Sequence, residues 1–260
     1  MNSCQIHRLW NGITPILTIN LVDAGIVDAS FNEVLTYVAV KAFDEFTGAY
    51  PSVTRNSDGK RRRRRITENQ KHINFGSPLS SGNNMFFEYQ RTHGFRLAIP
   101  SISDCPCVQK LEDEIFVNAS IHYLKHAVDA TLIADQLASA SGEFSIDLWA
   151  AIQRGKGAYH AFHVHEGAVL SGVYYSACPV GCAPLVLRKS TDEGRTNECI
   201  KETIEDDVII EPREGDLILF PPWTMHGVTA SHSVDKPRVS WPFNLNARLA
   251  NIGNSWDITR

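Results

Sequence analysis

The chain has 260 residues, of which 43% are hydrophobic and 21% charged, and its formal net charge is −4. This composition is typical of a globular protein, and one large domain covering residues 1–260 is expected. The small negative charge provides no general attraction to nucleic acid or to an anionic membrane. No apolar run approaches the roughly 18–20 residues of a membrane helix, and the first residues lack the pattern of a secretory signal. A cytoplasmic protein is therefore predicted.

The first part of the chain, residues 1–143, is predicted to be a helical and irregular cover. Residues 16–21 are typical of an opening strand. Apolar residues then recur at helical spacing over residues 32–43, behind an expected cap at Ser30. Two further helices are predicted over residues 108–126 and 128–140. Their apolar stripes are those of helices that brace a sheet.

A basic run interrupts this cover. Residues 47–81 are rich in Gly, Ser, Asn and charge, and they contain Lys60 followed by five arginines, Arg61 to Arg65. Six adjacent cations repel one another and cannot be buried together, which predicts a mobile surface loop that is dispensable for chemistry. A nuclear address and a docking patch for an anionic partner are the alternatives.

From residue 144 the pattern changes to short strands separated by turns that contain Gly and Pro. The predicted strands are residues 146–152, 159–165, 170–177, 184–187, 208–210, 217–220, 227–230 and 238–245. Strands of this length and spacing favour two packed antiparallel sheets. The predicted fold class is mainly β with flanking helices. Its core, at residues 144–246, is a cupin-like jelly roll, also called a double-stranded β-helix.

Three histidines and an arginine carry the chemical signal. His163 and His165 are two residues apart in a predicted strand, so both imidazoles can point to one site. His226, from a later strand, could complete one face of a metal's coordination sphere and leave the opposite positions open. Arg238 could hold a carboxylate beside that metal through two parallel bonds, and Ser240 shares its strand face. These residues predict an iron oxygenase that uses an oxo-acid cosubstrate.

A resemblance to a known family begins at residues 157–175, whose sequence is GAYHAFHVHEGAVLSGVYY. This segment resembles the signature of a family of 2-oxoglutarate- and Fe(II)-dependent oxygenases, in which an H-x-H pair and a turn precede an L-S-G-V-Y-Y strand. Residues 212–221, 226–228 and 238–244 are similar to the second half of the signature. The resemblance covers residues 145–246 closely and the preceding part only loosely.

The resemblance implies a double-stranded β-helix and the cofactors Fe(II) and 2-oxoglutarate. The implied reaction is oxidative decarboxylation of 2-oxoglutarate by molecular oxygen. It is coupled to oxidation, most often hydroxylation, of a second substrate. That substrate, a small molecule or a peptide, is not specified by any motif, and neither is the oligomeric state.

The resemblance also implies the metal ligands. His163 and His226 match the two histidines of the signature. The wider superfamily places Asp or Glu two residues after the first histidine, and this chain has His165 there. Three neutral imidazoles can still hold Fe(II), although they lack a negative charge that would help to retain it. Glu166 is the alternative ligand, and its side chain points the opposite way unless the strand bulges.

The cosubstrate residues follow from the same match. Arg238 is the expected partner of the far carboxylate of 2-oxoglutarate, and Ser240 can add a hydroxyl donor. Tyr175 falls where related oxygenases place a tyrosine that binds the same carboxylate, and Ser171 shares its strand face. Core packing of the Tyr175 ring and a surface ion pair of Arg238 are the alternatives.

Four residues near the metal pair have weaker signals. Trp149, Gln153 and Tyr159 are candidates for lining a substrate cavity, and ordinary packing would account for them equally well. His160 is expected off the ligand face, either behind the ligands or facing solvent.

Three other classes remain open, of which a basic-loop interaction protein would account only for residues 60–65. A cupin-like dioxygenase with three histidines would not use 2-oxoglutarate, and it would not need Arg238 and Ser240. A non-catalytic jelly-roll binding protein would not need three imidazoles directed at a metal. The six cysteines, at positions 4, 105, 107, 178, 182 and 199, predict free thiols, with a structural zinc site or disulfides as alternatives.

Overall fold

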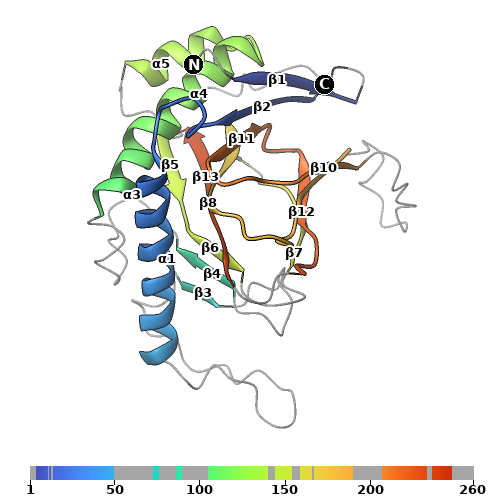
Figure 1. The fold of residues 1–260 in the computed structure, drawn as a ribbon. Helices are drawn as coiled ribbons and strands as arrows, with labels where there is room; N and C mark the ends of the chain where they lie inside the picture. Colours follow the sequence, from blue (N-terminus) through green and yellow to red (C-terminus); the bar gives the residue numbers. More distant parts are fainter. Residues whose placement is uncertain are drawn as a thin grey trace.

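A computed structural model of the chain describes residues 4–10, 12, 14–49, 73–75, 86–89, 105–139, 144–153, 159–165, 167–189, 207–232 and 236–247. This part of the chain forms two antiparallel sheets, with helices packed along one side (Figure 1). The predicted mainly-β jelly roll with flanking helices is confirmed. None of the described helices is long and apolar enough to cross a membrane.

The larger sheet contains nine strands in the described residues. They are β1 (Gln5–Leu9), β2 (Thr14–Asn20), β3 (Ile73–Phe75), β4 (Phe86–Tyr89), β5 (Phe144–Leu148), β6 (Ala151–Gln153), β8 (Leu170–Ala177), β11 (Asp216–Phe220) and β13 (Arg238–Ala247). Their order is β1-β2-β11-β8-β13-β6-β4-β3, and β5 also pairs with β13. The centre of the sheet is therefore β8 and β13, which lie side by side although about 70 residues separate them in sequence.

The smaller sheet contains four strands in the described residues, in the order β10-β9-β12-β7. They are β7 (His160–His163), β9 (Leu185–Arg188), β10 (Val208–Ile210) and β12 (Met225–Val228). Figure 1 shows this sheet opposite the centre of the larger one. The space between the two sheets holds the site described below.

The helices cover the other face of the larger sheet (Figure 1). They are α1 (Ala29–Ala49), α3 (Pro106–Lys110), the π-helical turn η3 (Leu111–Phe116), α4 (Val117–His126) and α5 (Thr131–Ala138). The helix predicted over residues 108–126 is the continuous run from α3 to α4. The cap of α1 is Asp28 and not Ser30 as predicted, because the Asp28 carboxylate accepts the Phe31 amide at 2.9 Å and the Ser30 hydroxyl at 2.7 Å.

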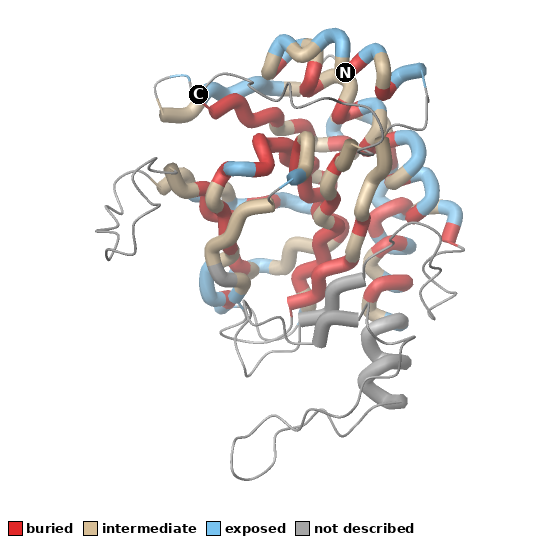
Figure 2. Tube along the Cα trace, turned by 180° about the vertical axis from the view of Figure 1, so that it is seen from behind, coloured by how far each residue is buried: buried red, intermediate tan, exposed pale blue. Residues whose placement is uncertain are grey.

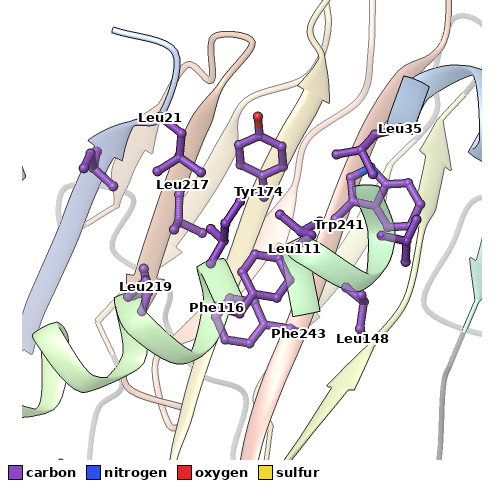
Figure 3. Close-up of a cluster of buried hydrophobic side chains, with 14 of the residues drawn as sticks. Leu21, Leu35, Leu111, Phe116, Leu148, Tyr174, Leu217, Leu219, Trp241 and Phe243 are labelled. Carbon is purple, nitrogen blue, oxygen red and sulfur yellow. The ribbon is translucent and has the colours of Figure 1, made fainter. Parts of the chain in front are cut away.

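Alternation along the central strands separates two sets of side chains. Tyr174, Trp241 and Phe243 face the helices, where they pack with Leu111 and Phe116 (Figure 3). Their sequence neighbours on β8 and β13 face the smaller sheet. Figure 2 shows the consequence, with the central strands of the larger sheet buried along most of their length and helices exposed on their outer side. The main core thus lies behind the larger sheet, which leaves the opposite face free to form a cavity.

Two differences from the predicted strands have identifiable causes. The strand predicted at residues 146–152 is divided into β5 and β6, because Pro242 of the facing β13 has no N–H to continue the ladder. The Trp149 amide still donates to the Pro242 carbonyl at 3.1 Å. The strand β1 was not predicted, because its side chains are mostly exposed and carry no alternation.

The predicted cover at residues 1–143 also supplies β3 and β4, strands of three and four residues that are too short to leave a pattern. The predicted loop at residues 47–81 overlaps the end of α1 and β3. Its basic run, Lys60 to Arg65, lies outside the described residues. Cys4, Cys105, Cys107, Cys178 and Cys182 are free thiols, as predicted, and Cys199 is not described.

Replacing Gly172 by alanine is expected to lower the free energy of unfolding by about 1–3 kcal/mol. A Cβ at Gly172 would lie 2.7 Å from the Phe243 Cζ atom and 3.2 Å from the Ile218 carbonyl oxygen. Phe243 has little freedom to move away, because its ring stacks on Phe116 at a centroid distance of 3.9 Å. Urea unfolding measures the effect. The matched double variant Gly172→Ala/Phe243→Leu should be less destabilised than the sum of the single changes, and strict additivity would contradict this explanation.

Candidate metal centre

Three imidazoles converge between the two sheets. His163 is the last residue of β7 and lies directly opposite His226 of β12. His165 follows the end of β7, where its backbone amide donates to the Pro222 carbonyl at 2.9 Å. The ligand atoms of the three side chains all lie within 4.8 Å of one another. The structure therefore brings together the three predicted ligands, although His165 lies beyond the strand that was expected to contain it.

The hydrogen bonds of His226 define which nitrogen faces the centre. Its Nδ1 lies 2.9 Å from the Thr224 carbonyl oxygen, which can only accept, so Nδ1 carries the proton. The lone pair of Nε2 is then directed at the centre, 3.2 Å from Nε2 of His165. Two imidazole nitrogens at this distance share either a proton or a metal ion. A histidine held through its other nitrogen in this way is the usual arrangement of a metal ligand.

Burial keeps two of the three imidazoles, those of His165 and His226, neutral. It lowers the pKa of His226 well below the ordinary value, and the neighbouring His163 and His165 lower it further. Burial, followed by the charge of His163, lowers the pKa of His165 to about 4. Metal ions bind the neutral form of histidine, so at neutral pH His165 and His226 are in their ligating state.

The metal-free protein is expected to lose stability as the pH falls from about 6.5 to about 4. The folded-state pKa values of His165 and His226 lie below those of the unfolded chain, so the unfolded chain binds more protons in this range. The free energy of unfolding therefore decreases as the pH decreases. Urea unfolding of metal-free protein at several pH values measures the slope. The variant His165→Gln should show a shallower slope, and a stability that is independent of pH would contradict the burial of neutral imidazoles.

A buried arginine lies in the same region. Arg238, the first residue of β13, is 3% exposed. Its guanidinium donates to Gln153 Oε1 at 3.0 Å, to the Tyr175 hydroxyl at 3.3 Å and to Ser240 Oγ at 3.5 Å. All three partners are neutral. Among the described residues, its Nε has no hydrogen-bond partner and no carboxylate forms an ion pair with it.

The environment of the Arg238 guanidinium is suited to binding an anion. A buried cation that is not paired with an opposite charge is costly, and a bound carboxylate would offset that cost. Burial also raises the pKa of Tyr175 to about 12, although the nearby Arg238 lowers it, so Tyr175 keeps its proton as a hydrogen-bond donor. Arg238, Tyr175 and Ser240 together form a site suited to a carboxylate group.

One cavity connects the imidazoles with this carboxylate site. Both sheets contribute to its walls, which include His163, His165, His226, Ser171, Tyr175, Arg238 and Ser240. All seven of the predicted metal-binding and cosubstrate-binding residues therefore line a single cavity. A ligand that bridges a metal ion and a buried cation would fit this arrangement of groups.

Ser171 contacts a residue that the sequence reasoning did not single out. Its hydroxyl donates to Asn244 Oδ1 at 2.8 Å, whereas the hydrogen bonds of the Arg238 guanidinium go to Gln153, Tyr175 and Ser240. The Asn244 amide in turn lies 3.1 Å from Nδ1 of His165. Sequence reasoning missed Asn244, and the only signal that could have found it is its even spacing from Arg238 and Ser240 along β13.

The weaker candidates are divided between the cavity and the surface. His160 and Trp149 line the cavity, with ring centroids 4.6 Å from His163 and 5.8 Å from His165 respectively. His160 is half-buried in the cavity wall, beside the ligands rather than in open solvent, and burial lowers its pKa to about 3. Gln153 holds Arg238, whereas Tyr159 is 40% exposed and is not in the cavity wall.

Glu166, the alternative metal ligand, lies outside the described residues.

Comparison with known proteins agrees with the site. Residues 147–244 match the family described as "Putative 2OG-Fe(II) oxygenase". This part of the chain, which contains all the predicted site residues, is that of a 2-oxoglutarate- and Fe(II)-dependent oxygenase. The predicted class and its cofactors, Fe(II) and 2-oxoglutarate, are confirmed at this level. No curated protein has a sequence that matches the chain.

Several solved structures resemble the chain distantly. A prolyl-4-hydroxylase from Pseudomonas putida is 13% identical, with 90% of this chain and 92% of that chain covered and a TM-score of 0.42. A prolyl hydroxylase from Trichoplax adhaerens, in complex with a hypoxia-inducible factor peptide, is 14% identical, with 89% and 83% covered and a TM-score of 0.44. AviO1 from Streptomyces viridochromogenes is 11% identical, with 88% and 89% covered and a TM-score of 0.49. Because these likenesses are distant, the class rests on the family match.

Proposed function

We propose that the protein uses this cavity to couple oxidative decarboxylation of 2-oxoglutarate to oxidation of a second substrate, most often hydroxylation, by molecular oxygen. In this proposal His163, His165 and His226 hold the iron. Arg238, Ser240 and Tyr175 bind the far carboxylate of 2-oxoglutarate. The second substrate is a small molecule or a peptide, and the expected location is the cytoplasm.

The observation that carries the proposal is the pairing of two unlike groups in one cavity. Three imidazoles converge within 4.8 Å, and the same walls hold a buried guanidinium with only neutral hydrogen-bond partners. A three-histidine dioxygenase that does not use 2-oxoglutarate would have no need to bury that cation. A non-catalytic binding protein would have no need to bring three imidazoles together at one centre.

The donor set fits iron. Imidazole nitrogen is a common ligand of Fe(II), and three imidazoles leave coordination positions for a bidentate oxo-acid and for oxygen. When bound, the iron supplies the activation of oxygen, which is chemistry that no side chain can perform. His226 is prepared for this role because its Nδ1–H is already held by the Thr224 carbonyl.

The other residues of the cavity bind and orient. The planar guanidinium of Arg238 can form two parallel bonds with a carboxylate, and this fixes the direction of the ligand as well as its position. The Tyr175 hydroxyl, which keeps its proton, can donate a further bond, and so can Ser240. With the far carboxylate fixed at Arg238, the oxo-acid end of the ligand would face the imidazoles. The enclosing sheets exclude water from the space between them.

Formation of succinate from 2-oxoglutarate tests the proposal. Purified protein supplied with Fe(II), oxygen and 2-oxoglutarate is expected to form succinate slowly in the absence of a second substrate. N-oxalylglycine should inhibit the reaction, and removal of Fe(II) by a chelator should stop it. A protein that binds Fe(II) but neither binds nor consumes 2-oxoglutarate would instead be a three-histidine dioxygenase of another kind. A protein that binds no metal would refute the proposal in all its parts.

A further inference from the structure

A row of hydrogen bonds leads from Ser171 through the metal centre to Thr224. Ser171 Oγ lies 2.8 Å from Asn244 Oδ1, and Asn244 Nδ2 lies 3.1 Å from Nδ1 of His165. Nε2 of His165 lies 3.2 Å from Nε2 of His226, whose Nδ1 lies 2.9 Å from the Thr224 carbonyl oxygen. The proposed reaction assigns no part to Asn244, although it is the side chain in contact with the far nitrogen of a ligand.

The positions of the protons along this row can be assigned from its end. The Thr224 carbonyl only accepts, so His226 carries its proton on Nδ1 and accepts at Nε2. Nε2 of His165 must then be the donor between the two rings. A neutral His165 with its proton on Nε2 has a lone pair on Nδ1. That lone pair accepts from the Asn244 amide nitrogen, while the Asn244 oxygen accepts from Ser171.

A metal ion at the centre requires a different arrangement. His165 can ligate through Nε2 only when that nitrogen is free of its proton. The proton of a neutral imidazole must then be on Nδ1, which becomes a donor and needs an acceptor. Asparagine can provide one, because a half-turn of its amide exchanges oxygen and nitrogen with almost no change of outline. Ser171 can remain bonded in both arrangements, because a hydroxyl donates and accepts.

We propose that Asn244, held by Ser171, is a positioning residue that sets the tautomer of His165 and turns its amide when the metal centre is filled. This inference rests on the metal centre of the proposed function. Asn244 would complete a row in which no group is charged, in keeping with a centre whose three ligands are neutral. A hydrogen bond at Nδ1 also fixes the orientation of the ring and so directs Nε2 at the metal.

The fold supports this role. Asn244 and Ser171 are direct cross-strand partners of β13 and β8, so the sheet register itself places the amide beside the hydroxyl. Asn244 is separated by an even number of residues from Arg238 and Ser240, and the alternation of β13 therefore directs all three to the cavity side. The odd-numbered Trp241 and Phe243 between them are packed against the helices.

Two variants of Asn244 separate this role from simple packing. Leucine has a similar size but neither donates nor accepts, and Asn244→Leu is expected to weaken Zn(II) binding by about 10–100-fold. An aspartate accepts without turning, so Asn244→Asp is expected to bind Zn(II) at least as tightly as the unaltered chain. Asn246→Leu is the matched control, because Asn246 lies on the same strand and bonds Asp147 at 2.8 Å. The Asn246→Leu variant should leave the affinity for Zn(II) unchanged. Competition with a chromophoric chelator measures all four affinities on full-length protein.

Nitrogen-15 NMR of the histidine side chains reports which ring nitrogen of His165 carries the proton. A change in packing alone would not alter this result. In the unaltered chain the proton of His165 should be on Nε2 without metal and on Nδ1 with Zn(II). In Asn244→Asp, Nδ1 of His165 should carry a proton in both states.

Three results would overturn the inference. They are an unchanged affinity in Asn244→Leu, an equal loss of affinity in Asn244→Asp, and a tautomer of His165 that stays the same when metal is added to the unaltered chain. Failure of the unaltered chain to bind Zn(II) at all would instead refute the proposed metal centre. The two failures are distinguishable because only in the second does the unaltered chain fail to bind Zn(II).

Discussion

Replacing His226 by alanine is expected to abolish metal binding while leaving the two sheets intact. The loss of metal affinity should be larger than 10–100-fold, which is roughly the decrease seen when a residue that only supports a metal ligand is changed. The reason is that a ligand itself is removed. His163→Ala should have the same effect, since the two residues are direct cross-strand partners and face one centre. Calorimetric titration with Mn(II), Co(II) or Zn(II) measures the affinity, and circular dichroism checks the fold.

The control for this prediction is His232→Ala, because His232 is exposed and is not in the cavity wall. That variant should bind metal as the unaltered chain does. Full retention of metal by both His163→Ala and His226→Ala would contradict the assignment. The third ligand is identified by comparing His165→Ala with Glu166→Ala. If only the glutamate change releases the metal, the three-histidine centre is wrong.

Replacing Arg238 by alanine is expected to weaken 2-oxoglutarate binding at least tenfold with little change in metal affinity. Loss of a charged partner from a buried ion pair typically costs about 2–5 kcal/mol, and tenfold corresponds to about 1.4 kcal/mol. The residues that would remain at the carboxylate, Tyr175 and Ser240, are neutral and cannot replace the charge. Titration of Mn(II)-loaded protein with 2-oxoglutarate measures the effect. Arg238→Lys should have an intermediate affinity, because lysine keeps the charge but not the planar pair of donors.

Arg213→Ala is the matched control for Arg238. Arg213 is an exposed arginine that pairs with Asp23, so its removal should leave the cavity and the affinity for 2-oxoglutarate unchanged. An unaltered affinity in Arg238→Ala would contradict the role of this residue. Such a result would favour a three-histidine dioxygenase that does not use 2-oxoglutarate.

The sequence alone determined the features that depend on local periodicity. A strand alternates its side chains with a period of two residues, so the spacing of His163 and His165, and of Arg238 and Ser240, already assigns each pair to one face. The same regularity identified β8, β11 and β13 almost to the residue. These predictions needed no knowledge of which strands are neighbours, and for that reason they could be made from residue order.

The tertiary structure decided everything that depends on pairing between distant segments. The contact of Ser171 with Asn244 exists because β8 and β13 pair in one particular register, and no local pattern specifies that register. The break between β5 and β6 is caused by Pro242 of a strand about 90 residues later in the chain.

The burial of a side chain also depends on distant segments of the chain. His160 has a neutral side chain within the cavity wall because β12 and the larger sheet enclose it, not because of its own neighbours in sequence. The residues that can ligate and bind anions are thus readable from the order of amino acids. The partners that set their protons and orientation come from strands that meet only in the folded chain, because hydrogen bonding across a sheet is a non-local interaction.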